Sequence, residues 1–115
     1  MIRLNIPKSF IGNGFRDGVV IVPDGNHLRI YDNASFQALL HGISKPMSNA
    51  VNAVFRYSIS NAVKCNVDDR FRIKIPRELA GKANIMPGTP VVLIGVKDCA
   101  ELYDEEIWKT ISANL

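Results

Sequence analysis

The chain has 115 residues, of which 47% are hydrophobic and 22% are charged, as in an ordinary globular domain. Its 14 Lys and Arg against 11 Asp and Glu leave a net charge of +3, which suits a polyanionic partner without requiring one. The sequence contains no signal-peptide pattern and no run of roughly 18 apolar residues, so we expect a cytoplasmic protein that has no membrane partner.

The first predicted elements are strands. Polar and apolar residues alternate over residues 2–6, which is the period of a half-buried strand, and Pro7 ends that strand because it lacks an N–H. Residues 19–22 and 28–31 predict two further strands, joined by a turn at Asp24-Gly25-Asn26.

Helices are predicted after these strands. Asp32 stands where a helix N-cap belongs, and it is followed at helical spacing by Phe36, Leu39, Leu40 and Ile43. A linker helix is predicted over about residues 46–60, beginning at Pro46.

The remaining residues predict a second set of similar elements. A strand at 63–67 leads into a turn at Asp68, and Arg70, Arg72 and Lys74 then share one face of the next strand, which Pro76 ends. The later elements are a helical turn at 77–80, a proline–glycine turn at 86–90, strands at 91–96 and 101–103, and a helix capped by Asp104.

An internal duplication relates the two sets of elements. The matching blocks keep their order: 2–8 with 71–77, 19–22 with 91–94, and 28–32 plus Phe36 with 100–104 plus Trp108. We therefore predict one domain over residues 1–115, with repeat halves at about 1–44 and 61–115 joined by the linker helix at about 46–60.

The candidate site consists of basic side chains near the repeated strands and one carboxylate: Arg3, Asp68, Arg70, Arg72 and Lys74. An arginine fork can donate two hydrogen bonds to guanine in the DNA major groove, and lysines bind phosphates. A carboxylate four residues before Arg72, across a turn, can hold that guanidinium in one orientation. The alternative is an ordinary surface ion pair, worth at most about 1 kcal/mol, and spacing alone favours this alternative.

Enzymatic chemistry has few candidates. The chain has no Ser-His-Asp order, no metal-ligand cluster and no convincing pair of carboxylates, so we expect no catalytic residue, metal, cofactor or small-molecule substrate. His27 and His41 are predicted on the surface, and Cys65 and Cys99 as buried thiols. The residues expected to pack in the core are Tyr31, Phe36, Met86, Tyr103 and Trp108.

The segment from about residue 55 to 108 carries a resemblance to a known family. Its Asp68-x-x-x-Arg72 spacing, the stretch Phe-Arg-Ile-Lys-Ile-Pro-Arg-Glu-Leu at 71–79, Ile-Gly at 94–95 and Glu-Leu-Tyr-Asp-Glu-Glu-Ile-Trp at 101–108 resemble the MraZ family of transcription regulators. The resemblance implies a mixed α/β, strand-rich fold. In that fold, two tandem AbrB-like swapped-hairpin halves form a pseudo-two-fold β-barrel flanked by helices.

The resemblance also implies a function. It implies ring-shaped homo-oligomers, located in the cytoplasm at the nucleoid, that bind short G-rich direct repeats in double-stranded DNA upstream of cell-division and cell-wall genes. The family's DNA contacts centre on the Asp-x-x-x-Arg motif, which here is Asp68 and Arg72, and the first-half arginine is Arg3.

Two departures from the family pattern stand out. Phe71 and Ile2 replace the glycine before each motif arginine; because such residues disfavour a positive φ, we expect a different turn geometry. The first copy also begins at its arginine, so we expect Arg3 to lack an orienting aspartate and the first half to lack one strand. Either the natural start lies upstream, or the chain is a reduced relative whose sheet is completed otherwise.

Two classes of function stay open. The first is a sequence-specific DNA-binding regulator. The alternative is a protein-interaction module, as in AbrB-type antitoxins, or a reduced paralogue that has lost DNA specificity. The few residues after the last predicted helix argue against an antitoxin, which holds its partner with a separate tail.

Overall fold

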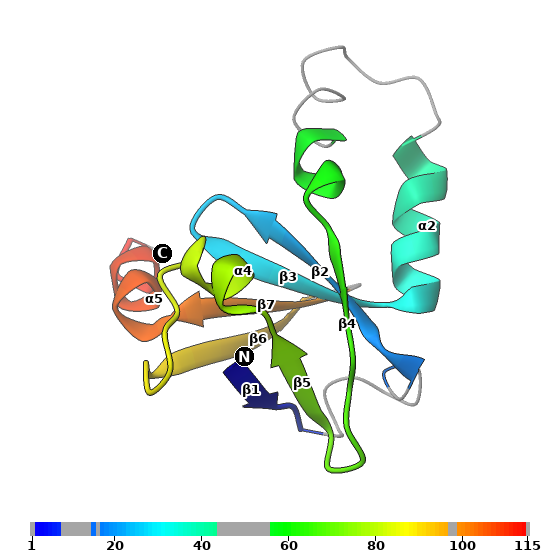
Figure 1. Cartoon of the computed structure of the whole chain (residues 1–115). Coiled ribbons are helices and arrows are strands. Elements are labelled where there is room, and N and C mark those ends of the chain that lie inside the picture. The colour runs from blue at the N-terminus through cyan, green and yellow to red at the C-terminus, as the bar shows by residue number, and fades with distance from the viewer. Residues whose placement is uncertain (1, 8–14, 16, 44–55, 97–98, 115) are drawn as a thin grey trace.

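The computed structural model describes residues 2–7, 15, 17–43, 56–96 and 99–114 (Figure 1). In chain order its elements are β1 (Ile2–Asn5), β2 (Val19–Asp24), β3 (His27–Asp32), α2 (Asn33–Ile43), β4 (Val63–Cys65), β5 (Arg72–Ile75), α4 (Arg77–Gly81), β6 (Val91–Val96), β7 (Cys99–Asp104) and α5 (Glu105–Ser112). The predicted mixed α/β, strand-rich class is confirmed. Residues 56–60 are also helical, and the earlier part of the expected linker helix lies outside the described residues.

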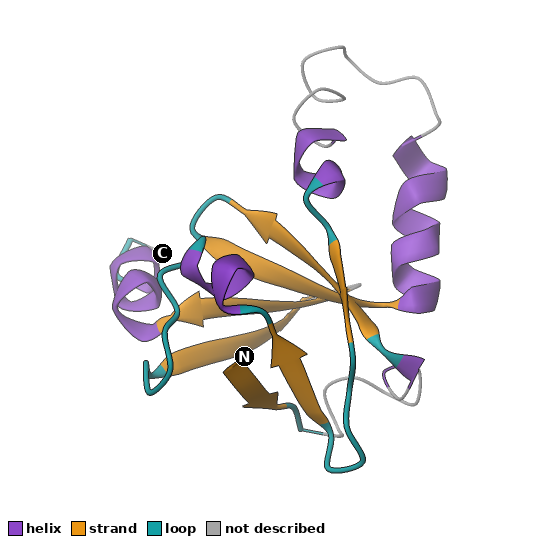
Figure 2. Ribbon diagram, viewed as in Figure 1, coloured by secondary structure: helices purple, strands orange, loops and turns teal. Residues whose placement is uncertain are grey.

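The described strands form two antiparallel sheets and no closed barrel. One is a two-stranded ribbon of β1 and β5, and the other is a five-stranded sheet in the order β4-β2-β3-β7-β6 (Figure 2). Strands from the two halves of the chain pair with each other in both sheets, because β1 pairs with β5, β2 with β4, and β3 with β7. The halves are therefore joined through main-chain hydrogen bonds as well as through the core.

The pairing of β3 with β7 follows the internal duplication. Arg29 lies opposite Glu101, its own duplicate, and the pair Leu28–Leu102 is matched by the pair Ile30–Ala100. A residue lies opposite its own duplicate only where a two-fold axis passes between the two strands. This register therefore places a pseudo-two-fold axis between Arg29 and Glu101.

The ribbon obeys the same symmetry. Leu4 lies opposite its duplicate Ile73, and the flanking pairs are Arg3–Lys74 and Asn5–Arg72. Each flanking pair is the duplicate of the other, because Arg3 corresponds to Arg72 and Asn5 to Lys74. The two duplicated strands thus make one symmetric ribbon.

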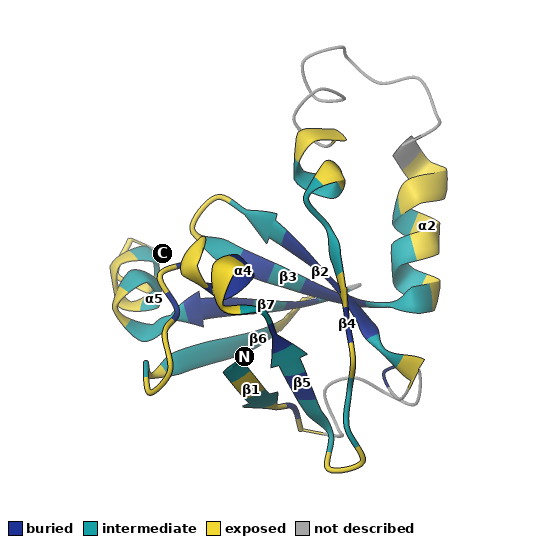
Figure 3. Ribbon diagram, viewed as in Figure 1, coloured by how far each residue is buried: buried dark blue, intermediate teal, exposed yellow. Residues whose placement is uncertain are grey.

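The main core fills the space between the five-stranded sheet, the ribbon and α4. Its largest fully buried side chains are Val19, Ile21, Leu28, Ile30, Ile73, Ile75 and Leu102 (Figure 3). On the other face of the sheet, a smaller cluster packs Val20, Val22 and Tyr31 against Phe36 and Leu39 of α2. Burial of both faces explains why β2 consists of almost continuous apolar residues.

Several local predictions are tested by the elements themselves. The Asp32 carboxylate accepts the Ser35 N–H at 2.6 Å, which confirms the cap of α2. Asp104 occupies the N-cap of α5, but its side chain makes no capping hydrogen bond. The prediction that Met86 packs in the core is wrong: the residue is 67% exposed and begins an exposed turn, in which the Thr89 N–H donates to the Met86 carbonyl.

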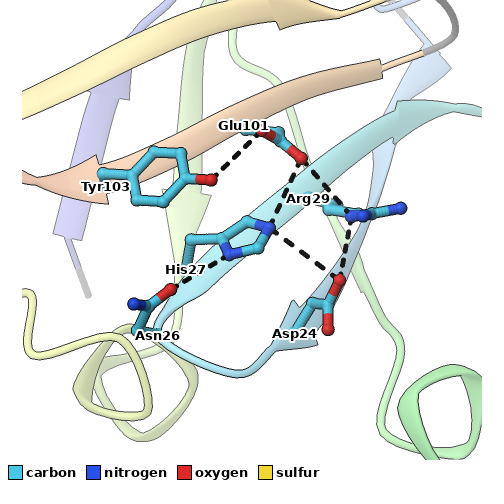
Figure 4. A network of polar contacts seen from close by, with 6 residues as sticks. All are labelled: Asp24, Asn26, His27, Arg29, Glu101 and Tyr103. Atoms are coloured by element: carbon cyan, nitrogen blue, oxygen red, sulfur yellow. Dashed lines mark hydrogen bonds and ion pairs between the residues drawn. The ribbon is translucent and has the colours of Figure 1, made fainter. Parts of the chain in front are cut away.

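Charged and aromatic side chains occupy the face of the sheet opposite the main core, at the axis between β3 and β7 (Figure 4). Arg29 Nε lies 3.0 Å from Asp24 Oδ2 and 3.6 Å from Glu101 Oε2. His27 Nε2 lies 3.4 Å from Glu101 Oε2, and its ring stacks on Tyr103 with the centroids 4.6 Å apart. The prediction of a surface His27 is therefore wrong: its side chain is only 13% exposed, because Tyr103 of the paired strand covers it.

The two outer strands of the five-stranded sheet differ in how they are covered. On one side β4 pairs with β2, and residues 19–22 of β2 are all buried. The duplicated residues 91–94 of β6 are only half-buried, and within the described residues no strand pairs with the outer edge of β6. The edge strand β6 thus presents unpaired main-chain groups and apolar side chains together.

Candidate nucleic-acid interface

The β1–β5 ribbon has one apolar and one polar face. Ile6, Ile73 and Ile75 are buried in the core, and Ile2 and Leu4 pack against it. Because side chains alternate along a strand, the intervening residues point away from the core. They are Arg3, Asn5, Arg72 and Lys74, which give the ribbon a basic outer face.

The register brings these four side chains together in two rows. The Asp68 N–H donates to the Arg72 carbonyl, and the Lys74 N–H donates to the Asn66 carbonyl. The main-chain groups of Arg72 and Lys74 therefore form their hydrogen bonds on the side of β5 that faces away from β1. Arg72–Asn5 and Lys74–Arg3 are therefore the non-hydrogen-bonded pairs of the ribbon, in which side chains approach most closely. The structure thus gathers Arg3, Arg72 and Lys74 on one surface.

The Asp68 carboxylate accepts three hydrogen bonds, two of which come from Arg72 and fix its position. Its Oδ1 accepts the main-chain N–H groups of Arg70 at 2.9 Å and Arg72 at 3.0 Å. Its Oδ2 accepts the Arg72 Nε–H at 2.7 Å, and the Asp68 side chain is 15% exposed. One carboxylate therefore closes the turn and orients the guanidinium, so Arg72 is held by more hydrogen bonds than in a simple surface ion pair.

These contacts keep the Asp68 carboxylate charged. The Arg72 N–H is the main cause that lowers the pKa of Asp68, with further help from the Arg70 N–H and the Arg72 guanidinium, against partial burial. A lowered pKa means that the contribution of Asp68 is complete above the ordinary carboxyl pKa of about 3.9 and is lost as the pH falls through the lowered value. The orientation of Arg72 by Asp68 is therefore insensitive to pH around neutrality.

Phe71 adopts the left-handed conformation that glycine would favour, with a φ of 58°. The expectation of a different turn geometry is therefore wrong. The Phe71 N–H donates to the Asp68 carbonyl and the Phe71 carbonyl accepts the Ile6 N–H, both at 3.1 Å, so hydrogen bonds on both sides fix this conformation. The turn therefore forms with a residue other than glycine, and the positive φ of Phe71 strains the backbone locally.

We expect Phe71→Gly to be more stable than Phe71→Ala by about 1 kcal/mol. Both variants lose the ring, but only alanine retains a Cβ at a positive φ, which costs about that much. At ordinary positions the order is reversed, because glycine loses more backbone entropy than alanine on folding. Urea denaturation of the two variants measures the difference, and an alanine variant at least as stable as the glycine variant would contradict the strained turn.

Arg70 does not share the strand face expected for it. It is exposed in the turn before β5, which begins at Arg72, because the positive φ at Phe71 interrupts the alternation of side chains. Its side chain therefore lies beside the basic face of the ribbon and not on it. Sequence reasoning also passed over Asn5, whose alternation with Arg3 was visible but whose position opposite Arg72 depends on the register.

Replacing Asp68 with asparagine separates its two tasks. An asparagine oxygen still accepts the main-chain N–H groups, but its NH₂ cannot accept the Arg72 Nε–H. We expect about fivefold weaker binding to a preferred DNA duplex, because Arg72 must then be ordered on binding. Binding to a scrambled duplex should not weaken, since a negative charge has been removed; equal weakening on both duplexes would contradict an orienting role.

Other kinds of site find little support in the described residues. No group of three or more His, Cys, Asp or Glu in this part of the chain is placed to hold a metal ion. Burial raises the pKa of the Cys65 thiol to about 11, so this side chain is protonated and unreactive at neutral pH. No helix in the described ranges is long and apolar enough to cross a membrane.

The closing half of the chain, which carries Asp68 and Arg72, matches a family model. Residues 59–115 match the model of MraZ protein, antitoxin-like. The chain belongs to the MraZ family. The turn held by Asp68, the basic ribbon strand β5, and the β6–β7 hairpin with α5 all lie inside this match.

Individual MraZ relatives extend the similarity to the first half. The chain is 27% identical over 111 residues to Transcriptional regulator MraZ of Lachnoclostridium phytofermentans, a match that covers 96% of this chain and 77% of that protein. The protein of the same name from Alkaliphilus metalliredigens is 29% identical over 113 residues, covering 92% and 74%. That of Thermoanaerobacter sp. strain X514 is 36% identical over 62 residues, covering only 54% of this chain and 42% of that protein.

Proposed function

We propose that this chain is a transcription regulator that binds double-stranded DNA in a sequence-specific manner. Arg3, Asp68, Arg70, Arg72 and Lys74 form its DNA-binding site. The observation that carries the proposal is the Asp68–Arg72 contact, which holds an arginine fork on the exposed face of a two-stranded ribbon. The family relationship supports it, since the relatives are named transcriptional regulators and not enzymes.

The ribbon has the shape and charge that this role needs. A two-stranded antiparallel ribbon fits the DNA major groove, where base edges are distinguishable. Arg72 and Arg3 reach base edges from the outer face, and Lys74 lies beside Arg3. Arg70, exposed in the adjoining turn, contacts the phosphate backbone and adds affinity without sequence preference.

The proposal includes a homo-oligomer, ring-shaped as the family resemblance implies. The half-buried, unpaired edge of β6 supports assembly, because its residues 91–96 carry no charge that would repel a second chain. An oligomer presents several copies of the ribbon, which matches short direct repeats in DNA. The proposed setting is the nucleoid in the cytoplasm, at repeats upstream of cell-division and cell-wall genes.

Fluorescence anisotropy with the purified protein tests the proposal. A duplex of G-rich direct repeats and a scrambled duplex of equal length are titrated at two salt concentrations. The expected result is tighter binding to the repeats, with an affinity for both duplexes that falls as salt rises. Equal weak binding to both duplexes would contradict sequence-specific regulation. A small protein that co-purifies from the native host would then favour the interaction-module alternative.

A further inference from the structure

The two rows of the ribbon face differ in one residue. The pseudo-two-fold axis at Leu4–Ile73 relates Arg3 to Arg72, so each row contains an arginine. The same axis relates Asn5 to Lys74, and these two side chains differ in charge and in hydrogen bonding. The ribbon is therefore symmetric in its backbone and asymmetric in the residue beside each arginine.

Asparagine and lysine recognise different base edges. An asparagine amide both accepts and donates, so it can bond N6–H₂ and N7 of adenine together. A lysine ammonium only donates, which suits the two acceptors O6 and N7 of guanine and offers nothing to the adenine N6–H₂ group. Asn5 and Lys74 thus distinguish adenine from guanine at equivalent positions of the two rows.

The geometry puts each of these residues beside an arginine. Asn5 and Arg72 form a non-hydrogen-bonded cross-strand pair, as do Lys74 and Arg3, with Cβ atoms typically about 5 Å apart. Successive rows on one face of a strand lie about 6.7 Å apart, close to two base-pair steps of about 3.4 Å. Each row can therefore address its own base step within one major groove.

We propose that Asn5 is a specificity-determining residue, and that the ribbon reads a non-palindromic DNA site. The row of Arg72 and Asn5 reads guanine next to adenine, whereas the row of Arg3 and Lys74 reads guanines. Asn5 and Lys74 are the side chains whose type differs between the two rows, so Asn5 sets the base that is read beside Arg72. This inference rests on the proposed function, because it assigns a base to a residue of the same DNA-binding face.

The test compares two variants that add the same positive charge. Asn5→Lys gives each row one arginine and one lysine, and Asn114→Lys adds a lysine at an exposed position after α5, outside the ribbon. The protein and both variants are titrated against a preferred duplex and its single-base substitutions. Thermal melting followed by circular dichroism establishes that both variants are folded.

The expected result is a change of one base preference. The unmodified protein should prefer adenine over guanine about tenfold at one position beside a guanine, and Asn5→Lys should reverse this preference to guanine by a similar factor. Asn114→Lys should keep the adenine preference. An Asn5→Lys profile that still prefers adenine would overturn the inference alone. An unmodified protein that prefers no base at any position would overturn the inference and the proposed function together.

Discussion

Arg72→Ala is expected to bind a preferred duplex about 10- to 100-fold more weakly than the unmodified protein. The guanidinium is held by Asp68 before DNA arrives, so its two donors reach a guanine at little entropic cost. A bidentate arginine–guanine contact contributes about 1–3 kcal/mol of discrimination against a wrong base, or about 5- to 150-fold in affinity, and the expected loss lies within this range. Titration by fluorescence anisotropy at fixed salt measures the loss.

The loss should appear in sequence preference more than in general affinity. Removing one positive charge weakens binding to a scrambled duplex only slightly. The ratio of the affinity for the preferred duplex to the affinity for the scrambled duplex should therefore fall towards one. Arg56→Ala removes the same charge from an exposed position outside the ribbon and should leave the ratio intact. If Arg72→Ala bound its preferred duplex as well as Arg56→Ala does, Arg72 would not be a base-reading residue.

Glu101→Arg is expected to lower the free energy of unfolding by about 3 kcal/mol. The Glu101 side chain is 16% exposed, lies 3.6 Å from Arg29 Nε and 3.4 Å from His27 Nε2, and accepts a hydrogen bond from the Tyr103 hydroxyl, so an arginine there removes all of these contacts. It also places two guanidinium groups opposite each other at the pseudo-two-fold axis. Breaking a buried ion pair costs about 3–5 kcal/mol, and the partial exposure of Arg29 favours the lower end.

Urea denaturation measures this change, with Glu106→Arg as the control. Glu106 undergoes the same change of charge on α5, but its side chain is 80% exposed and contacts only Lys109 among the ion pairs described, so we expect a change within about 0.5 kcal/mol. Similar losses in both variants would show that net charge matters and the axis contact does not. Glu101→Gln should lie between them, because it keeps the shape and loses the charge.

The Arg29–Glu101 contact explains how two similar halves stay paired with each other. Two copies of the first half would place Arg29 opposite itself across the axis, and two copies of the second half would do the same with Glu101. Like charges directly opposite destabilise a strand pair, whereas the observed opposite charges stabilise it. The duplicated strands thus carry opposite charges at the position of the β3–β7 pair where each residue lies opposite its own duplicate.

Much of the fold was predictable from local pattern. The alternation along β1, the near-continuous apolar runs of β2 and β6, the proline and glycine turns and the Asp32 cap all depend on neighbours in the chain, and each appears where expected. The spacing of Asp68 and Arg72 likewise predicted their contact, since four residues across a turn bring both side chains to one place. The assignment of DNA-binding roles to these residues stays a prediction.

The failures share a different cause. His27 looked isolated in the sequence but is covered by Tyr103, a residue of the paired strand. Met86 looked like a packing residue but is exposed in its turn. Phe71 was expected to avoid a positive φ and adopts one, because hydrogen bonds with Asp68 and with Ile6, the residue after β1, hold it there. For His27 and Phe71 a deciding contact comes from a segment distant in the chain, Tyr103 in one case and Ile6 in the other.

The sequence by itself determined the repeat, the strands, the turns, the resemblance to the MraZ family and the Asp68–Arg72 pair. These features depend on residue type and on short spacings along the chain, and both can be read directly from the sequence. Only the tertiary structure decided that Asn5 stands beside Arg72, that Arg29 meets Glu101, and that no described strand pairs with the outer edge of β6. The physical reason is that a one-residue shift between paired strands changes every cross-strand neighbour, and burial of the core residues across both sheets selects the register.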